Sequence, residues 1–111
     1  ITNSMIREID IDIAKKLFQN NMLFIDARAE QYYEKGHIPS ALCNDDIEKL
    51  INEIEKKISF DDGFVVYCSD DDCGSSEELA ISLQEQGFMN IFLFKGGWKQ
   101  WVENNLPIDI K

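Results

Sequence analysis

One of the cysteines, Cys68, lies at a position where its thiol could act as a nucleophile. Cys68 follows the apolar run Phe64-Val65-Val66-Tyr67, and a short polar segment separates it from a stretch of helical character that begins at Ser75. This order predicts a strand, a loop and a helix, and open α/β sheets bind ligands at the carboxyl ends of their strands. Loop amides and a helix N-terminus can stabilise an anion such as a thiolate or a persulfide. The sequence therefore predicts Cys68 as a nucleophile, the alternative being a small buried residue that ends a core strand.

A second thiol lies in the loop that should surround Cys68. The loop expected to cradle the reacting sulfur consists of Ser69, Asp70, Asp71, Asp72, Cys73, Gly74 and Ser75. A thiol at Cys73 can attack a persulfide or a disulfide on Cys68, so Cys73 is either a resolving partner or a solvent-facing loop residue. The spacing of these thiols and carboxylates matches neither a calcium loop nor a zinc motif, so we expect no metal. Thiol chemistry also requires no organic cofactor.

Five short apolar segments are the candidate strands that must position this loop. Three of them read as buried strands, Leu23-Phe24-Ile25, Phe64-Val65-Val66-Tyr67 and Ile91-Phe92-Leu93-Phe94, and two as edge strands, Ile6 to Ile9 and Ala41-Leu42-Cys43. Because segments of helical period lie between them, the pattern predicts an α/β domain around a mostly parallel sheet.

Two helices are predicted from periodicity and capping signals. The first carries an apolar stripe at Ile47, Leu50, Ile51, Ile54 and Ile58, preceded by the N-cap candidates Asn44, Asp45 and Asp46. The second is expected to open with a capping box formed by Ser75 and Glu78 and to end at Gly87 in a left-handed conformation.

Composition limits the partners and the compartment. The 21 acidic residues outnumber the 11 basic ones, and the net charge of −10 repels phosphate backbones and anionic lipid surfaces. We therefore expect no nucleic-acid partner and no membrane insertion. The three cysteines include no CxxC pair and do not form a secreted disulfide framework, so we expect a reducing, cytoplasmic compartment.

The chain is long enough for one domain. We assign residues 6–111 to that domain and interpret residues 1–5 as the remnant of a tag or the edge of a further domain. Fusion to, or docking on, another domain stays open.

Several motifs in order resemble those of the rhodanese-like sulfurtransferase domain, and the resemblance extends from Ile6 to Pro107. The matching segments are Asp26-Ala27-Arg28, Tyr33-Glu34-Lys35-Gly36-His37-Ile38-Pro39-Ser40-Ala41, Gly87-Phe88, Phe94-Lys95-Gly96-Gly97-Trp98-Lys99-Gln100-Trp101 and Asn105-Leu106-Pro107. The resemblance implies a five-stranded, mostly parallel sheet flanked by helices, and a Cys68 that carries sulfur as a persulfide.

The sequence departs from the family pattern at two cation positions. Ser75 stands where common members carry the arginine of the active-site loop. Tyr32, which we take with Arg28 as a candidate pocket residue, stands where two-domain thiosulfate-using members carry another arginine. Like charges near 4 Å repel by ~1 kcal/mol in water, so the aspartates of this loop should discriminate against thiosulfate. A phosphatase function is disfavoured because phosphoryl transfer needs a cation, and no Arg or Lys occurs between Cys68 and Gln86.

Other residues with chemical potential are expected to be structural. We expect Asp26 and Arg28 to form an ion pair near the pocket, which Arg28 would help shape, and His37 to fix a turn rather than act as a base. Phe94, Trp98 and Trp101 have the spacing of a packing face, and Cys43 is expected to be an inert core residue.

Three functions follow from these observations. The first is a sulfurtransferase in which Cys68 takes sulfur from a small donor or a protein persulfide and passes it to an acceptor thiol. The second is thiol-disulfide exchange through Cys68 and Cys73. The third is a non-catalytic interaction domain whose acidic surface binds a basic partner.

Overall fold

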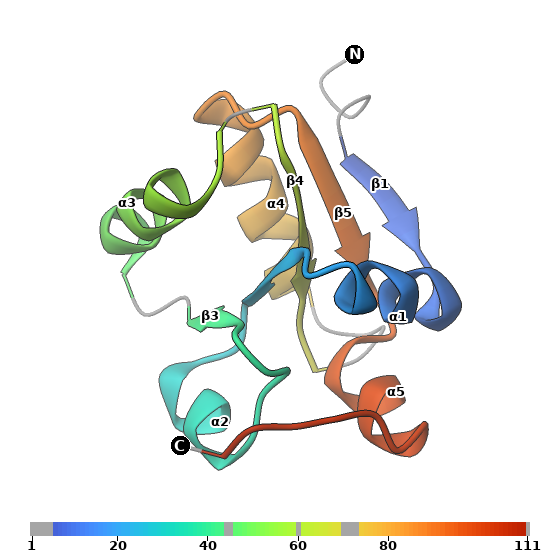
Figure 1. Ribbon diagram of the computed structural model, residues 1–111. Helices are drawn as coiled ribbons and strands as arrows, with labels where there is room; N and C mark the ends of the chain where they lie inside the picture. The colour runs from blue at the N-terminus through green and yellow to red at the C-terminus, as the bar shows by residue number, and fades with distance from the viewer. Residues whose placement is uncertain (1–5, 44–45, 60, 70–73, 111) are drawn as a thin grey trace.

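The computed structural model describes residues 6–43, 46–59, 61–69 and 74–110. Within these residues the strands are β1 (Ile6–Ile9), β2 (Leu23–Asp26), β3 (Leu42–Cys43), β4 (Gly63–Tyr67) and β5 (Asn90–Phe94). They form one sheet in the order β1-β5-β4-β2-β3, and every pair of neighbours is parallel (Figure 1). The predicted α/β class is confirmed, β1 and β3 are the expected edge strands, and β4 lies at the centre.

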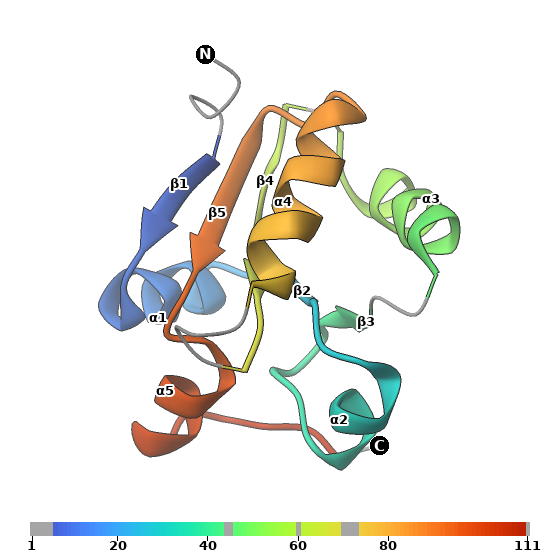
Figure 2. The ribbon, with the colours of Figure 1, turned by 180° about the vertical axis from the view of Figure 1, so that it is seen from behind.

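Helices cover both faces of the sheet. They are α1 (Ile11–Gln19), α2 (Glu30–Lys35), α3 (Ile47–Lys57), α4 (Ser75–Glu85) and α5 (Gly97–Glu103). One face is covered by α3 and α4 and the other by α1 and α5, while α2 lies beyond the end where β2 and β3 finish (Figures 1 and 2). None of the helices in the described part of the chain is long and apolar enough to cross a membrane.

Side chains of β4 alternate between two separate cores. Phe64 and Val66, followed by Cys68, pack in the cluster that includes residues of α3 and α4, whereas Val65 and Tyr67 pack in the cluster that includes residues of α1 and α5. This is the period of two that a strand imposes. Cys68 and Tyr67 therefore face opposite sides of the sheet although they are adjacent in sequence.

The predicted capping box at the start of α4 is wrong. Gly74, not Ser75, occupies the N-cap position, and its φ of −85° and ψ of −6° are helical, with no side-chain capping hydrogen bond. An N-cap hydroxyl needs an extended backbone at the N-cap residue to reach the amides of the first turn. Here the backbone is already helical at Gly74. Ser75 is instead the first residue of the helix.

The other helix signals are mostly confirmed. Asp46 caps α3 by accepting hydrogen bonds from the amides of Glu48 and Lys49, and Gly87 follows α4 with a φ of 112°. Asn44 and Asp45, the other N-cap candidates, lie outside the described residues. In the stripe of α3, Ile47 is 40% exposed because it lies in the first turn, at the end of the helix.

Helix α1 was missed by the sequence analysis although the chain carries its signals. Asp10 accepts a hydrogen bond from the amide of Ile13 at 3.0 Å and caps the helix. Ala14 is buried, and Leu17 and Phe18 pack on the same core at helical spacing.

Candidate active site

Cys68 occupies the predicted position at the carboxyl end of the central strand. It follows β4 directly, is 2% exposed, and belongs to the core cluster that also contains Ala27, Leu79 and Ala80. Its sulfur is disulfide-bonded in the structure. The strand, loop and helix arrangement places Cys68 where ligands bind in sheets of this kind.

The first two residues of the loop are attached to α5. The amide of Trp98 donates to the carbonyl of Cys68 at 2.8 Å, and the amide of Lys99 donates to the carbonyl of Ser69 at 2.9 Å. Gly74 and Ser75 are exposed and start α4. Asp70, Asp71, Asp72 and Cys73 lie outside the described residues, so the cradle and the resolving thiol stay predictions.

A surface cavity opens beside the start of α4. Its volume is about 320 Å³, and it is lined by Ala27, Ile47, Ser75, Glu78, Leu79 and Ser82. Ala27 and Leu79 belong to the same core cluster as Cys68. Among these lining residues Glu78 is the one that carries a charge, so this approach to the site is anionic.

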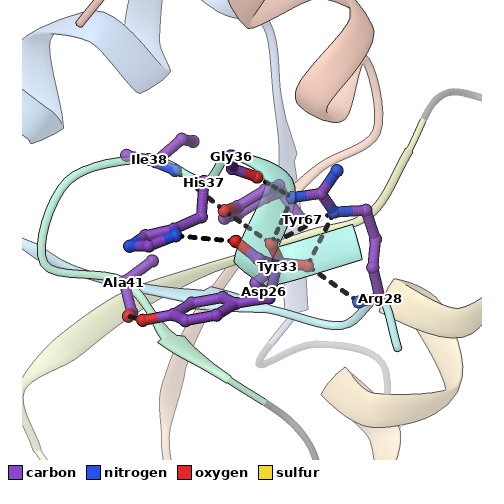
Figure 3. A network of polar contacts seen from close by, with 8 residues as sticks. All are labelled: Asp26, Arg28, Tyr33, Gly36, His37, Ile38, Ala41 and Tyr67. Atoms are coloured by element: carbon purple, nitrogen blue, oxygen red, sulfur yellow. Dashed lines mark hydrogen bonds and ion pairs between the residues drawn. The ribbon is translucent and has the colours of Figure 1, made fainter. Parts of the chain in front are cut away.

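Asp26 and Arg28 form the predicted ion pair, and it is buried (Figure 3). The guanidinium donates from Nε to Oδ1 at 3.0 Å and from the terminal nitrogen NH2 to Oδ2 at 2.7 Å, and NH2 also donates to the carbonyl of Gly36 at 2.6 Å. The side chains of Asp26 and Arg28 are 0% and 5% exposed. Bidentate pairing of this kind is among the strongest interactions between an arginine and a carboxylate.

Tyr67 joins this ion pair to the segment that contains His37. Its hydroxyl donates to Asp26 Oδ2 at 2.9 Å and accepts from the amide of Ile38 at 3.1 Å (Figure 3). Because Tyr67 faces the side of the sheet opposite Cys68, the ion pair lies on that opposite side. The ion pair therefore supports the fold around the site and leaves little free positive charge for an anionic substrate.

The guanidinium of Arg28 also contacts an aromatic side chain of α5. Its central carbon lies 4.7 Å from the centre of the Trp98 ring, a cation-π distance. Trp98 is partly buried against the core that contains Phe94 and Trp101, as the packing-face prediction required. Tyr32, the other pocket candidate, lies on α2 and is 48% exposed.

His37 has the structural role expected for it. Its Nδ1 lies 2.9 Å from the carbonyl of Tyr33, its ring stacks on the Tyr33 ring at 3.8 Å, and its backbone pairs with Asp109. The Tyr33 hydroxyl donates to the carbonyl of Ala41 at 2.6 Å. Burial, and to a smaller extent the nearby Cys43, raises the pKa of Tyr33. Cys43 is half-buried on β3.

Sequence reasoning did not find Tyr67 or the contact of Trp98 with Arg28. A signal for Tyr67 existed, because a tyrosine ends an otherwise aliphatic and aromatic strand, and Asp26 ends the neighbouring strand in register with it. No sequence signal could place Trp98 beside Arg28, because the two residues are far apart in the chain.

The buried tyrosine predicts a loss of stability at high pH. Burial, followed by the charge of Asp26, raises the pKa of Tyr67 above its usual value. A raised folded-state pKa contributes stability that is complete below about pH 10 and is lost above it, by up to about 1.4 kcal/mol per pH unit for each such tyrosine. Tyr67→Phe should therefore make the fall of unfolding free energy shallower between about pH 10 and about pH 12, measured by urea unfolding.

Exposed Tyr32 provides the matched control for this experiment. Tyr32→Phe removes a phenol that is 48% exposed and should leave the slope as in the wild type. Identical slopes for the wild type and Tyr67→Phe would contradict the prediction.

The described residues contain no group of three or more His, Cys, Asp and Glu side chains arranged to hold a metal ion. Together, the fold and the position of Cys68 define the class of protein: an α/β domain with a cysteine at the end of its central parallel strand, followed by a loop and a helix.

Comparisons with known proteins agree with this class. The protein-family model of the rhodanese-like domain matches residues 10–104 of the chain. The chain is 29% identical over 103 residues to a thiosulfate sulfurtransferase GlpE of Haemophilus influenzae, covering 93% of this chain and 94% of the relative. It is 32% identical over 87 residues to a protein of the same name from Pseudoalteromonas translucida, covering 77% of each.

A solved structure shows the same fold. The BH2092 protein of Bacillus halodurans superposes with a TM-score of 0.79 at 21% identity, over 94% of this chain and 77% of that one. The chain belongs to the rhodanese-like domain family, which confirms the resemblance seen in its motifs.

Proposed function

We propose that this protein is a sulfurtransferase in which reduced Cys68 accepts sulfane sulfur from a persulfide and passes it to an acceptor thiol. The observation that carries the proposal is the position of Cys68 directly after β4. The backbone of Cys68 and Ser69, the base of the loop, is hydrogen-bonded to α5, and the loop leads to the start of α4. Relatives named thiosulfate sulfurtransferases support the type of reaction.

The transfer needs two displacements. The Cys68 thiolate attacks the outer sulfur of the donor persulfide, a new S–S bond forms, and the donor leaves as a thiolate. An acceptor thiolate then attacks the outer sulfur on Cys68, which releases the Cys68 thiolate again. Each step exchanges one S–S bond for another, so there is no net oxidation.

Charge at the site favours such a donor over thiosulfate, which carries two negative charges. Glu78 lines the cavity beside α4, and Ser75 brings no charge there. Arg28 is bound to Asp26 on the opposite side of the sheet. Among these residues a dianion would thus meet the Glu78 carboxylate and no unpaired cation, so its approach is electrostatically unfavourable.

The test begins with the fully reduced protein. We expect incubation with a thiol persulfide to add the mass of one sulfur atom, located at Cys68 by peptide mapping, and thiosulfate to add it much more slowly. If no donor in a panel of persulfides and thiosulfate adds sulfur at Cys68, the proposal is wrong.

Adding a cation at the start of α4 should improve thiosulfate use. We expect Ser75→Arg to raise the rate of sulfur loading from thiosulfate by about tenfold, because one well-placed cation stabilises the bound anion. Ser59→Arg is the matched control, since it adds the same charge at an exposed residue before β4, at the other end of the sheet. An equal gain in both variants would show that net charge, rather than the site, limits the reaction.

A second candidate function is thiol-disulfide exchange, favoured by the disulfide-bonded state of Cys68. In this reaction a substrate disulfide is reduced to two thiols while Cys68 and Cys73 are oxidised to one disulfide. Mild treatment with a small-molecule disulfide should then link Cys68 to Cys73, and Cys73→Ser should abolish that link. Absence of the link in the wild type would reject this candidate.

A further inference from the structure

The start of α5 is bonded to the residue that carries the reacting sulfur. Two consecutive amides, those of Trp98 and Lys99, donate to two consecutive carbonyls, those of Cys68 and Ser69. Segments far apart in the sequence are therefore joined at the base of the loop, where β4 ends and α5 begins (Figure 1).

These hydrogen bonds orient the peptide group between Cys68 and Ser69. The described residues contain no cis peptide bond, and in a trans peptide the carbonyl and the amide point in opposite directions. Because the Cys68 carbonyl points to the Trp98 amide, the Ser69 amide points away from α5. A backbone amide fixed in this way can donate a hydrogen bond without any cost of reorganisation.

Gly97 allows α5 to approach this closely. Its φ of +59° is left-handed, and a Cβ atom at this position would overlap the carbonyl oxygen of Cys68. Both the conformation and the contact exclude a side chain. The obstructing atom belongs to the backbone of Cys68, so it cannot rotate away.

The side chain of Trp98 also fixes the start of α5. Its ring lies against Arg28, and a Cβ on Gly36 would contact the ring at 2.9 Å. Arg28 in turn is bound to Asp26 and to the Gly36 carbonyl. The start of α5 is thus fixed between the buried ion pair and the loop base.

We propose that the start of α5 is a positioning element for Cys68, in which the Trp98 and Lys99 amides hold the loop base so that the Ser69 amide faces the reacting sulfur. Gly97 is the positioning residue that makes this contact possible. The inference rests on the proposed role of Cys68 as the nucleophile. A hydrogen bond from a fixed amide favours the thiolate over the thiol, so the contact makes Cys68 reactive at neutral pH.

Gly97→Ala tests this role in the reduced protein. We expect it to slow alkylation of Cys68 by limiting iodoacetamide at neutral pH by about tenfold and to move its pH profile upwards by about one unit, because the amide no longer faces the sulfur. Peptide mapping separates Cys68 from Cys43, whose alkylation should not change and which serves as the internal reference.

Gly96→Ala is the matched control. Gly96 has an ordinary helical backbone with φ −62°, and its Cβ would meet only the side chain of Gln100, which can rotate away. Its Cys68 profile should match the wild type. An unchanged Cys68 profile in folded Gly97→Ala, verified by circular dichroism, would overturn the proposal.

A backbone variant decides the question if Gly97→Ala does not fold. Replacing Trp98 by its α-hydroxy acid exchanges the amide N–H for an ester oxygen and keeps every side chain. The same upward shift of the Cys68 profile is expected, and a wild-type profile would refute the positioning role. Alkylation needs no sulfane sulfur, so a failure of sulfur loading in the wild type would be recorded separately from a failure of this inference.

Discussion

Cys68→Ser is expected to reduce sulfur transfer from a persulfide donor to an acceptor thiol by at least about a thousandfold. A serine hydroxyl stays protonated at neutral pH and cannot hold sulfur as a persulfide, so both displacements are lost. The substitution changes one atom in a side chain that is 2% exposed, and the fold should survive it. Steady-state transfer and intact mass after donor treatment both measure the effect.

Cys43→Ser is the matched control because it makes the same chemical change at another cysteine. Cys43 lies half-buried on edge strand β3, whereas Cys68 is 2% exposed and follows the central strand β4. We expect this variant to keep wild-type transfer within about threefold, as for a residue that does not touch the reacting atoms. Loss of transfer in Cys43→Ser together with retention in Cys68→Ser would reverse the assignment of the site.

Arg28→Leu is expected to lower the free energy of unfolding by about 3 to 5 kcal/mol. It removes the guanidinium that gives Asp26 three hydrogen bonds. The carboxylate that remains is 0% exposed and keeps only the hydrogen bonds from the Tyr67 hydroxyl and the backbone amide of residue 28. Breaking one side of a buried ion pair is costly because the remaining charge stays away from water. Urea unfolding at neutral pH measures this loss.

An exposed ion pair provides the comparison. Lys56 and Glu53 on α3 are 3.8 Å apart, with side chains 73% and 40% exposed. Lys56→Gln should change stability by no more than about 0.5 kcal/mol because water screens such a pair. If Arg28→Leu cost as little as Lys56→Gln, the ion pair of Asp26 and Arg28 would not contribute substantially to stability.

Much of the fold could be predicted from the chain because its signals are local. The apolar runs that became β2, β4 and β5 differ from the observed strands by one residue at an end, and the short segments at Ile6 and Leu42 are the edge strands. Strand propensity and period depend on neighbouring residues, so a linear reading captures them. Helix α1 carried the same kind of information in Asp10, Ala14 and Leu17.

Signals that depend on backbone conformation were less secure. Ser75 and Glu78 have the spacing of a capping box, yet the chain is already helical at Gly74. Gly87, in contrast, has the positive φ that its place after α4 suggested. A side-chain type permits a cap, whereas the path of the preceding loop determines whether the cap forms.

For the candidate site, the sequence by itself determined the nucleophile candidate, the ion-pair residues and the missing loop arginine, because residue type and order carry that information. Only the tertiary structure decided which side of the sheet each group faces. Alternation along β4 separates Cys68 from Tyr67, and register between β2 and β4 brings Tyr67 to Asp26. The contacts of Gly97 and Trp98 with the loop base join segments distant in sequence, and such contacts exist only once the sheet and its helices have packed.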